Sequence, residues 1–540
     1  MNDIFASDSW LNIAITQVND FLWTYILIGV LIICGIWFTW RTRFVQFRMV
    51  GEMIRLLADS SANHPGHKHI SSFQAFAVSV ATRVGTGNLA GVATAIAIGG
   101  PGAVFWMWTI ALIGSATAFV ESTLAQLFKL RHNVSFIGGP AYYIQKGMHN
   151  RWMAIVFAIL ITITFGLSYN SIQSNTICNA MYEAFGWSKV TTGILLVILS
   201  LTIVFGGIHR IAKVSSVIVP IMAIGYFIIA FTIVLMNLHL LPHVFKVIMS
   251  NAFGLEQIAG GGLGATMMNG IKRGLFSNEA GEGSAPNVAA TATTSHPVKQ
   301  GLIQALGVFT DTLLVCSCTA FIILISGLYT SPELNGIALT QSALQSEIGS
   351  IGPIFIAIAI FLFAFSSIIG NYYYGETNIR FLFEGGRRSY EGGRRSYEGG
   401  CEQQSCGMKE EGRKYFQHQT SSSPIGDNIN PRNSSLNPCN SSFKHILFLY
   451  RLFSGGILVM FGALASLEIV WNLGDLCMAL LTACNLIAII TLGKYAFKLL
   501  DDYRQQKKNG IKDPIFHRSQ LPEIEKDLDA WDEGCMKDEL

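Results

Sequence analysis

Charged residues are scarce in this chain. Asp, Glu, Lys and Arg make up 13% of its 540 residues, whereas hydrophobic residues make up 51%. A soluble domain carries about 25% charged residues. Because a charged side chain is costly inside a bilayer, the shortage indicates a protein that lies largely in lipid. The net charge is only +3, so binding to nucleic acid is not predicted.

Sequence patterns typical of enzymes are missing as well. The chain contains no metal-ligand motif, nucleophile elbow or Gly-rich phosphate loop, so neither an enzyme nor a cofactor is predicted. His64, His67 and His69 resemble a metal cluster, but they lie in a short polar loop without a nearby Cys or carboxylate, which favours a solvated loop. The ten cysteines lie in apolar segments or in segments predicted to be cytoplasmic, so a disulfide framework is not expected.

Long apolar segments dominate what is present. The first, from Phe21 to Trp40, is long enough to cross about 30 Å of hydrocarbon. A signal peptide is the alternative, but no basic region precedes this segment and no small-residue cleavage site follows, so a retained helix is predicted. Further spans are predicted at roughly 72–98, 102–128, 152–181, 191–208, 214–236, 258–294, 301–328, 352–378, 443–468 and 474–498. The predicted fold class is an all-α polytopic membrane protein with about 11 transmembrane helices.

The Lys and Arg residues lie at alternating ends of these spans, as the positive-inside rule requires. The loop from Arg41 to Arg55 and the segment from Lys494 to Lys508 are basic, whereas the connections near 99–101, 329–351 and 469–473 contain no Lys or Arg. We therefore predict a multi-pass protein of the cell (inner) membrane, with the N-terminus outside and the C-terminus cytoplasmic. The final Lys-Asp-Glu-Leu matches an ER-retrieval signal, but that signal is read in the lumen, so we interpret it as coincidence.

Two Gly-interrupted segments match each other at a constant offset of 190 residues. The matched positions are Arg83, Asn88, Ala90 and Gly91 with Arg273, Asn278, Ala280 and Gly281. At the same offset, Glu121-Ser122 matches Asp311-Thr312. The predicted topology gives the two segments opposite orientations, which is typical of an inverted repeat of five plus five helices. Because 258–294 is too rich in Gly and Ser for one regular helix, we predict broken helices and a binding site near the bilayer midplane.

This interpretation sets the predicted domain organisation. Residues 1–70 would hold an outside segment, the extra helix and a cytoplasmic loop, and 71–236 the first five-helix repeat. The second repeat would comprise 237–383 and 443–498, followed by a cytoplasmic tail at 499–540. Between its parts, 384–442 is a polar, low-complexity insertion with the heptad GGRRSYE twice in tandem, predicted to be a disordered cytoplasmic loop, with partner binding as the alternative.

The first Gly-interrupted segment predicts the binding chemistry. If the helix opens at Gly85, Thr86, Gly87 and Asn88, the restarting half presents free N–H groups and a positive dipole end to a substrate carboxylate. The preceding half ends in free carbonyls, which are ligands for a hard cation such as Na⁺. The alternative is that these glycines only allow close helix packing, but packing alone does not explain the paired repeat.

Polar residues in three other spans are further candidates. Gln173 needs a partner, which is either another helix or a ligand. Ser366 and Ser367 are adjacent hydroxyls that either complete a cation site or bond back to their own helix, and Asn371 is a candidate for the substrate pocket.

Ionisable residues within spans are functional candidates by default. We interpret Arg83, Arg273, Glu121 and Asp311 as structural pairs that neutralise each other, whereas Glu279 and Glu282 stay ambiguous.

Several long motifs resemble the alanine or glycine:cation symporter family. They are Val84–Trp106 (VGTGNLAGVATAIAIGGPGAVFW), Gly138–Ile144, Lys272–Gly281 with Gly283–Asn287, and Ser366–Glu376. The resemblance covers roughly residues 20–383 and 443–510. It implies a LeuT-type 5+5 inverted repeat preceded by one extra helix, and Na⁺-coupled uptake with H⁺ as a substitute. It also implies that Thr86 and Gly87 hold the amino-acid backbone, that Gln173 contacts it and that Phe276 helps to wall the pocket.

Two departures from that family bear on substrate choice and on the loops. Some members have Trp where this chain has Asn371, and the family usually has a short connection where this chain has the 384–442 insertion.

The predicted function is a secondary active symporter that couples Na⁺ or H⁺ influx to uptake of a small neutral amino acid, alanine and/or glycine, by alternating access. We expect it to work in the lipid bilayer as a monomer. The predicted substrate ligands are Thr86, Gly87, Asn88, Gln173, Phe276 and Asn371, and the predicted Na⁺ ligands are Ser366, Ser367 and the Gly85 carbonyl. The alternatives are a symporter for another small solute, a membrane-embedded enzyme and a channel.

Overall fold

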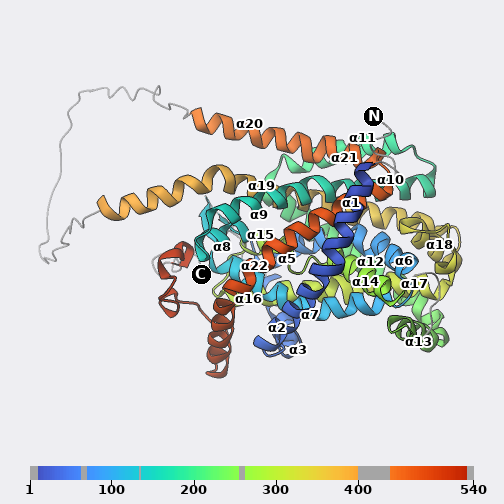
Figure 1. Ribbon diagram of the computed structural model, residues 1–540, viewed down its shortest axis with the longest axis horizontal. Coiled ribbons are helices and arrows are strands. Elements are labelled where there is room, and N and C mark those ends of the chain that lie inside the picture. The colour runs from blue at the N-terminus through green and yellow to red at the C-terminus, as the bar shows by residue number, and fades with distance from the viewer. Residues whose placement is uncertain (1–9, 62–69, 133–134, 255–261, 399–437, 532–540) are drawn as a thin grey trace, which may run out of the picture.

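The computed structural model describes residues 10–61, 70–132, 135–254, 262–398 and 438–531, which are almost entirely helical (Figure 1). Two short strands, β1 (Leu130–His132) and β2 (Ser135–Ile137), pair antiparallel. His64, His67 and His69, the last four residues and most of the predicted insertion lie outside the described residues.

The helices of the first half are α1 (Trp10–Phe21), α2 (Ile28–Arg41), α3 (Val45–Arg48), α4 (Val50–Ser61), α5 (Ser72–Arg83), α6 (Val92–Gly99), α7 (Ala103–Leu127), α8 (Pro140–Gly147), α9 (Arg151–Ile163), α10 (Asn170–Phe185), α11 (Lys189–Val204) and α12 (Gly207–Met236). Those of the second half are α13 (Leu241–Ala252), α14 (Leu263–Asn278), α15 (Ala285–Ala289), α16 (Pro297–Val308), α17 (Ser317–Ser326), α18 (Gly336–Ile348), α19 (Ile351–Glu398), α20 (Pro438–Leu452), α21 (Leu458–Leu464) and α22 (Leu467–Lys508). Short π-helical turns join several of them: η1 (Leu22–Leu27), η2 (Gly87–Gly91), η3 (Thr164–Tyr169), η5 (Phe309–Cys316) and η7 (Phe453–Ile457).

Eight continuous helices in the described part of the chain are long and apolar enough to cross a membrane, and two shorter apolar helices span Gly87–Gly99 and Lys189–Val204. This confirms the predicted polytopic, all-α membrane protein, whereas the number of eleven spans stays a prediction. The predicted irregularity of 258–294 is confirmed, because α14 ends at Asn278 and a non-helical turn separates it from α15.

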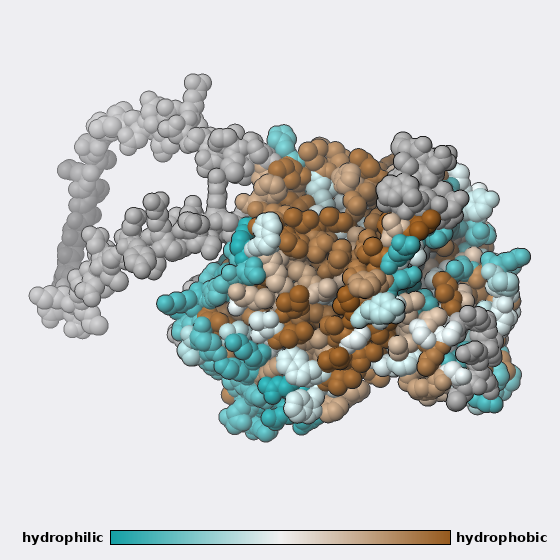
Figure 2. All heavy atoms as spheres, viewed as in Figure 1, coloured by the Kyte–Doolittle hydropathy of each residue, from teal (hydrophilic) through white to brown (hydrophobic). Residues whose placement is uncertain are grey.

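The surface matches a protein that lies in lipid. Large apolar side chains face outward, for example Ile33, Ile221 and Ile224, which are 68%, 65% and 60% exposed. Figure 2 shows hydrophobic residues over the middle of the visible face and hydrophilic residues toward both ends. In Figure 1, α13 and α18 lie at one end of the molecule, and α8 and the C-terminal segment lie at the other.

Local sequence signals start the helices that frame the site. A capping box begins α5, since the Gln74 N–H donates to Ser71 Oγ (3.1 Å) and the Ser71 N–H donates to Gln74 Oε1 (3.0 Å). Pro140 and Pro297 begin α8 and α16, where a missing N–H removes no helical hydrogen bond. Helix α19 does not end with the predicted span but continues past Phe383. The first residues of the predicted insertion, 384–398, are therefore helical.

At the centre, α7 and α16 pack closely along each other. Ser115 Oγ on α7 donates to the Ala305 carbonyl on α16 at 3.0 Å, across a separation of 190 residues. A Cβ added to Gly301 of α16 would overlap Thr123 Oγ1 and lie 2.8 Å from the Phe119 carbonyl oxygen, so only glycine permits this approach. Two residues at the predicted repeat offset therefore touch each other in the core.

Candidate functional site

The first predicted break lies between α5 and η2. α5 ends at Arg83, and Val84 then adopts an extended conformation with φ −77° and ψ 91°. Thr86 returns to helical geometry at the start of η2. A local hydrogen bond stabilises the break, since the Gly85 N–H donates to Asn88 Oδ1 at 2.9 Å. All of Thr86, Asn88 and the two glycines beside Thr86 are buried.

Gln173 on α10 reaches directly into this break. Its Oε1 accepts from the Thr86 N–H at 2.9 Å and from Thr86 Oγ1 at 2.8 Å. A carboxylate oxygen is an equally good acceptor for both donors. The structure thus joins two of the predicted substrate residues at the start of a helical segment, where the Thr86 N–H bonds Gln173 instead of a helix carbonyl.

Phe276 walls the same break from α14. A Cβ added to Gly87 would lie 3.0 Å from Ser277 Cα and 3.2 Å from Phe276 Cδ1, so the two broken segments touch there. The Phe276 ring packs between two aromatic rings, Tyr169 and Trp471, each with a centroid 4.8 Å away. Sequence reasoning missed both of these rings, since nothing in an apolar span marks which aromatic residue will face a distant helix.

The hydroxyls of Ser366 and Ser367 meet the carbonyl end of α5. Ser367 Oγ lies 2.9 Å from the Ala81 carbonyl oxygen and 3.1 Å from that of Phe363, and Ser366 Oγ lies 3.3 Å and 2.8 Å from the same atoms. The serines thus bond back to their own helix and also reach α5, whereas their role as cation ligands stays a prediction.

Four oxygens converge there, two from hydroxyls and two from carbonyls, which is a donor set suited to a hard monovalent cation. The Gly85 carbonyl, which was predicted as a ligand, accepts instead from the Asn88 N–H at 3.3 Å. Ala81 and Phe363 supply the carbonyls, and sequence reasoning missed them. Among the described residues, no group of three or more His, Cys, Asp or Glu residues is placed to hold a metal ion.

Gly85 lies where Gln173 and the Ser367 hydroxyl both approach the first break. A Cβ added to it would overlap Ser367 Oγ and lie 2.8 Å from Gln173 Oε1. We predict that Gly85→Ala lowers uptake of a transported amino acid at least about ten-fold, because the methyl group displaces both side chains. Uptake per purified protein in proteoliposomes measures this.

The control is Gly225→Ala on α12, where an added Cβ has nothing within 4 Å. If the Gly85 variant transports as fast as this control, the close contact has no functional role.

The second break lies between α14 and α15 and uses left-handed backbone. Glu279, Gly281 and Gly283 have φ values of 54°, 94° and 82°. The N–H groups of Gly281 and Gly283 donate to the two carboxylate oxygens of Glu121 on α7, each at 3.2 Å. Asn485 on α22 also donates to Glu121, at 2.9 Å. A buried carboxylate thus holds the turn, as an anion does at a helix N-terminus.

Asp311 has the matching role at the first break. Its carboxylate accepts from Asn88 Nδ2 at 2.7 Å and from Ser277 Oγ at 2.8 Å. Each acidic residue of the predicted repeat pair therefore binds the break that belongs to the other repeat.

The predicted pairing among the four intramembrane charges is wrong. Glu121 and Asp311 accept from neutral donors, and Arg83 Nη1 donates to the Gln304 carbonyl at 3.1 Å. Arg273 instead forms a bidentate ion pair with Asp475 on α22, at 3.0 and 2.8 Å. Pairing the residues by charge gave the wrong partners because neutral donors at the breaks bind the two carboxylates. These donors are backbone N–H groups for Glu121 and the Asn88 amide for Asp311. The arginine also lies over Trp471, 4.2 Å from the ring centroid.

Asn371 does not contact the first break directly. It lies on α19, one helical turn beyond Ser367, and its Nδ2 donates to Asn170 Oδ1 on α10 at 3.1 Å. Of the predicted residues, the structure thus groups Gly85, Thr86, Gly87, Asn88, Gln173, Phe276, Ser366 and Ser367 around the first break and leaves Asn371 one turn away.

Comparison with known proteins finds close relatives along nearly the whole chain. A family model described as the sodium:alanine symporter family matches residues 8–391 and 439–518. A "Probable sodium/glutamine symporter GlnT" of Bacillus subtilis is 48% identical over 505 residues, which are 93% of this chain and 92% of the relative. An "Amino-acid carrier protein AlsT" of the same organism is 45% identical over 97% of this chain and 99% of its own length. A "Sodium/alanine symporter AgcS" of Methanococcus maripaludis is 35% identical over 68% of this chain and 83% of its own length.

Proposed function

Because this chain belongs to the sodium:alanine symporter family, we propose that it couples Na⁺ influx to uptake of a small neutral amino acid, alanine and/or glycine, by alternating access. It is a multi-pass membrane transporter rather than an enzyme, and Na⁺ is its coupling ion. H⁺ is an alternative coupling ion, since one relative is named a sodium/proton-dependent alanine carrier protein.

One observation supports the amino-acid site above all others. The Thr86 N–H and hydroxyl converge on a single oxygen acceptor, Gln173 Oε1, at the start of a helical segment in the core. In the proposed complex the substrate carboxylate accepts from these donors, with Gly87 and Asn88 in the same break. The Phe276 ring, 3.2 Å from an added Gly87 Cβ, forms a wall of this break.

The proposed Na⁺ site shares α5 with the substrate site. Na⁺ would bind the hydroxyls of Ser366 and Ser367 and carbonyl oxygens at the end of α5, with Ala81 in place of Gly85 as the carbonyl the serines reach. Since the two sites meet at Gly85, each ligand stabilises the geometry that the other binds. Linkage then requires that Na⁺ and amino acid raise each other's affinity by the same factor.

The reciprocal contacts of the breaks support the finer fold proposal. Glu121 binds the second break, Asp311 binds the first, and Ser115 touches Ala305 across 190 residues. Such contacts between the two halves support a LeuT-type inverted repeat, preceded by one extra helix. In this proposal the first repeat is 71–236 and the second comprises 237–383 and 443–498. We further propose eleven spans, an outside N-terminus, a cytoplasmic C-terminus and a monomer that transports alone.

The test is uptake and counterflow of radiolabelled alanine, glycine and glutamine in proteoliposomes, with the Na⁺ gradient present, absent or reversed. We expect saturable uptake that requires the inward Na⁺ gradient, and counterflow that persists without it. Uptake that is unchanged without a Na⁺ or H⁺ gradient would overturn the symport proposal, and non-saturable flux would indicate a channel.

A further inference from the structure

Two buried asparagines lie against each other one turn from the proposed substrate site. Asn371 Nδ2 donates to Asn170 Oδ1 at 3.1 Å, and Asn170 Nδ2 donates to Ser454 Oγ at 3.1 Å. Asn371 is 1% exposed and Asn170 is fully buried. The remaining amide atom, Asn371 Oδ1, has no hydrogen-bond partner in the protein. An unpaired buried amide oxygen is costly, so a group that donates to it is expected.

The helix geometry places this pair one turn from the residues that adjoin the first break. Asn371 follows Ser367 by four residues on α19, and Asn170 precedes Gln173 by three on α10, so each pair shares a helix face. Ser367 and Gln173 both adjoin Gly85 in the first break. The asparagines therefore lie about 5.4 Å further along these two packed helices, the rise of one turn.

We propose that Asn371 selects substrates whose side chain ends in a carboxamide. The carboxamide NH₂ donates to Asn371 Oδ1, whereas a thioether of similar length would meet this oxygen without a donor. The alanine side chain is too short to reach Asn371, so alanine is not discriminated there. A site built around a hydrogen bond rejects an analogue that lacks the donor far more strongly than an apolar pocket rejects an extra methylene. This inference rests on the proposed function, since it assigns the side-chain half of the same site.

The test is competition against Na⁺-driven alanine uptake by glutamine, asparagine, methionine and glutamate. Glutamine and methionine have side chains of similar length, so they differ mainly in the donor. We expect glutamine to inhibit at a concentration at least about ten-fold lower than methionine. In Asn371→Leu the ratio of the two inhibitory concentrations should fall to less than about two-fold.

The matched control is Asn179→Leu, which removes an amide further along α10 that bonds only Asn175. It should keep the glutamine preference of the wild type. Equal inhibition by methionine and glutamine in the wild type, with alanine uptake intact, overturns the carboxamide inference and leaves the proposed function standing. If no amino acid is taken up, the proposed function itself fails.

A different observation concerns the segment 509–531, which we call the C-terminal clasp. It contains no long helix, yet five of its large apolar side chains are buried, whereas Ile511 and Ile515 are exposed. The five buried residues are Phe516, Leu521, Ile524, Leu528 and Trp531, each at most 4% exposed. A tail that merely trailed from α22 would leave such residues in water, so the clasp is part of the packed structure.

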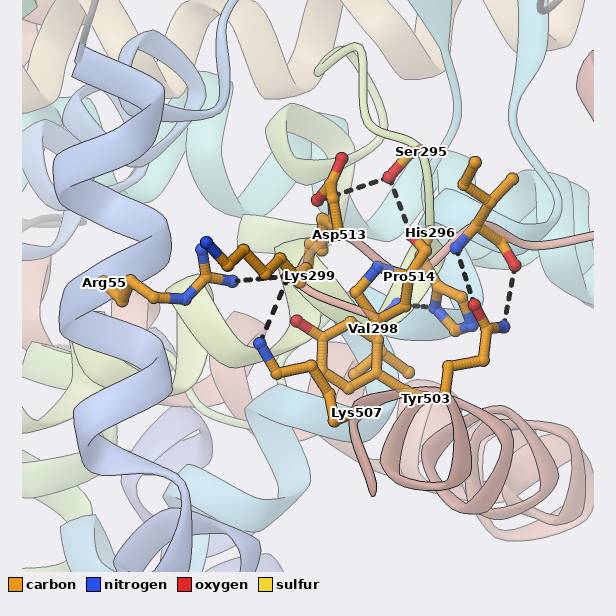
Figure 3. Close-up of polar contacts among 12 residues, drawn as sticks. Arg55, Ser295, His296, Val298, Lys299, Tyr503, Lys507, Asp513 and Pro514 are labelled. Atoms are coloured by element: carbon orange, nitrogen blue, oxygen red, sulfur yellow. Dashed lines mark hydrogen bonds and ion pairs between the residues drawn. The ribbon is translucent and has the colours of Figure 1, made fainter. Parts of the chain in front are cut away.

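The first half of the clasp binds the start of α16, as Figure 3 shows. Lys299 forms an ion pair with Asp513. Ser295 Oγ donates to the Pro514 carbonyl at 2.8 Å, and the Phe516 N–H donates to the Ser295 carbonyl at 2.9 Å.

Next to the clasp, side chains of α22 bind Glu52 of α4. Burial alone raises the pKa of Glu52, but hydrogen bonds from Arg55, Tyr503 and Lys507 outweigh it and lower that pKa to about 2. Glu52 therefore stays charged at physiological pH and α4 remains an anchor.

The second half of the clasp binds the end of α7. Trp531 Nε1 donates to the carbonyls of Gln126 and Leu127 at 3.2 and 3.1 Å, which caps carbonyls that the helix end leaves free. Asp529 forms a 2.6 Å ion pair with Lys146 on α8. One short segment thus joins α7 and α8 to the start of α16, and these belong to different proposed repeats.

We infer that the C-terminal clasp fixes α8 to the packed pair of α7 and α16 at this end and must loosen for each transport cycle. Ending the chain after Gly510 is then expected to raise the maximal uptake rate about three-fold or more, with half-saturating Na⁺ and substrate concentrations changed less than about two-fold. An unchanged maximal rate in a protein of equal thermal stability overturns the inference.

A second experiment covers the case in which the shortened chain does not fold. Lys146→Cys with Asp529→Cys in the full chain allows a thiol cross-linker to fix the clasp. The cross-linked protein should transport at least about five-fold more slowly, and a reducible linker should restore the rate on reduction. Each single-cysteine variant is the control for the protein's own thiols, and an unaffected rate in the cross-linked protein contradicts the inference.

Discussion

Replacing Ser366 and Ser367 together by alanine should raise the Na⁺ concentration for half-maximal amino-acid uptake at least about ten-fold. The two hydroxyls face the carbonyl oxygens of Ala81 and Phe363, and the double replacement removes half of the four oxygens that converge there. A hydrogen-bonding group that serves a charged ligand contributes about 1.5–3 kcal/mol, which corresponds to about ten-fold or more in affinity. The measurement is the initial rate of uptake in proteoliposomes as a function of external Na⁺.

The single variants separate the two roles of these serines. Ser367 Oγ approaches the Ala81 carbonyl more closely than Ser366 Oγ, at 2.9 against 3.3 Å, so Ser367→Ala should have the larger effect. Ser346→Ala on α18 is the control, since Ser346 Oγ bonds only its own helix, at Ala343. If the double variant shows the Na⁺ dependence of this control, the cation lies elsewhere.

The residues of the breaks could be predicted from the sequence because glycine and polar groups are conspicuous in apolar spans. Gly85, Gln173 and Ser367 do meet around one point. The carbonyl groups that the serine hydroxyls contact could not be predicted in the same way. Every residue has a carbonyl, so only the packing of α19 against α5 reveals that Ala81 is the one that the hydroxyls reach.

The charged residues show a different limit. Glu121 and Asp311 lie at the constant offset of 190 residues and each contacts one of the two breaks, but pairing by charge assigned them the wrong partners. Each carboxylate instead binds uncharged donors of a break, which are backbone N–H groups at the second break and the Asn88 amide at the first. The true partner of Arg273, Asp475, lies 202 residues away in the last long helix. No local sequence pattern predicts a contact between residues that are so far apart in the chain.

The largest effect on stability is expected at Asp475. Its carboxylate faces two cations, since Arg273 binds both oxygens and Lys272 Nζ lies 3.5 Å from Oδ2. All three side chains are at most 9% exposed. Asp475→Asn keeps the shape but leaves two buried cations without a counter-charge, and breaking a buried pair costs about 3–5 kcal/mol. We expect a large loss of folded protein on heating in detergent, measured by size-exclusion chromatography.

Arg273→Gln should cost less, because Lys272 still faces the remaining carboxylate. The Arg273→Gln, Asp475→Asn double variant should be less destabilised than the two single effects added together, since the pair is then removed as a unit. Glu468→Gln on the same helix is the control, because Glu468 is exposed and the Gln side-chain oxygen can still accept the hydrogen bond from Asn12 Nδ2 (3.2 Å). Arg273 also covers Trp471, which packs on Phe276, so the same variants should loosen the aromatic wall and slow uptake. Additive effects of the two single changes would show that Arg273 and Asp475 act independently, and the aromatic wall would then need another anchor.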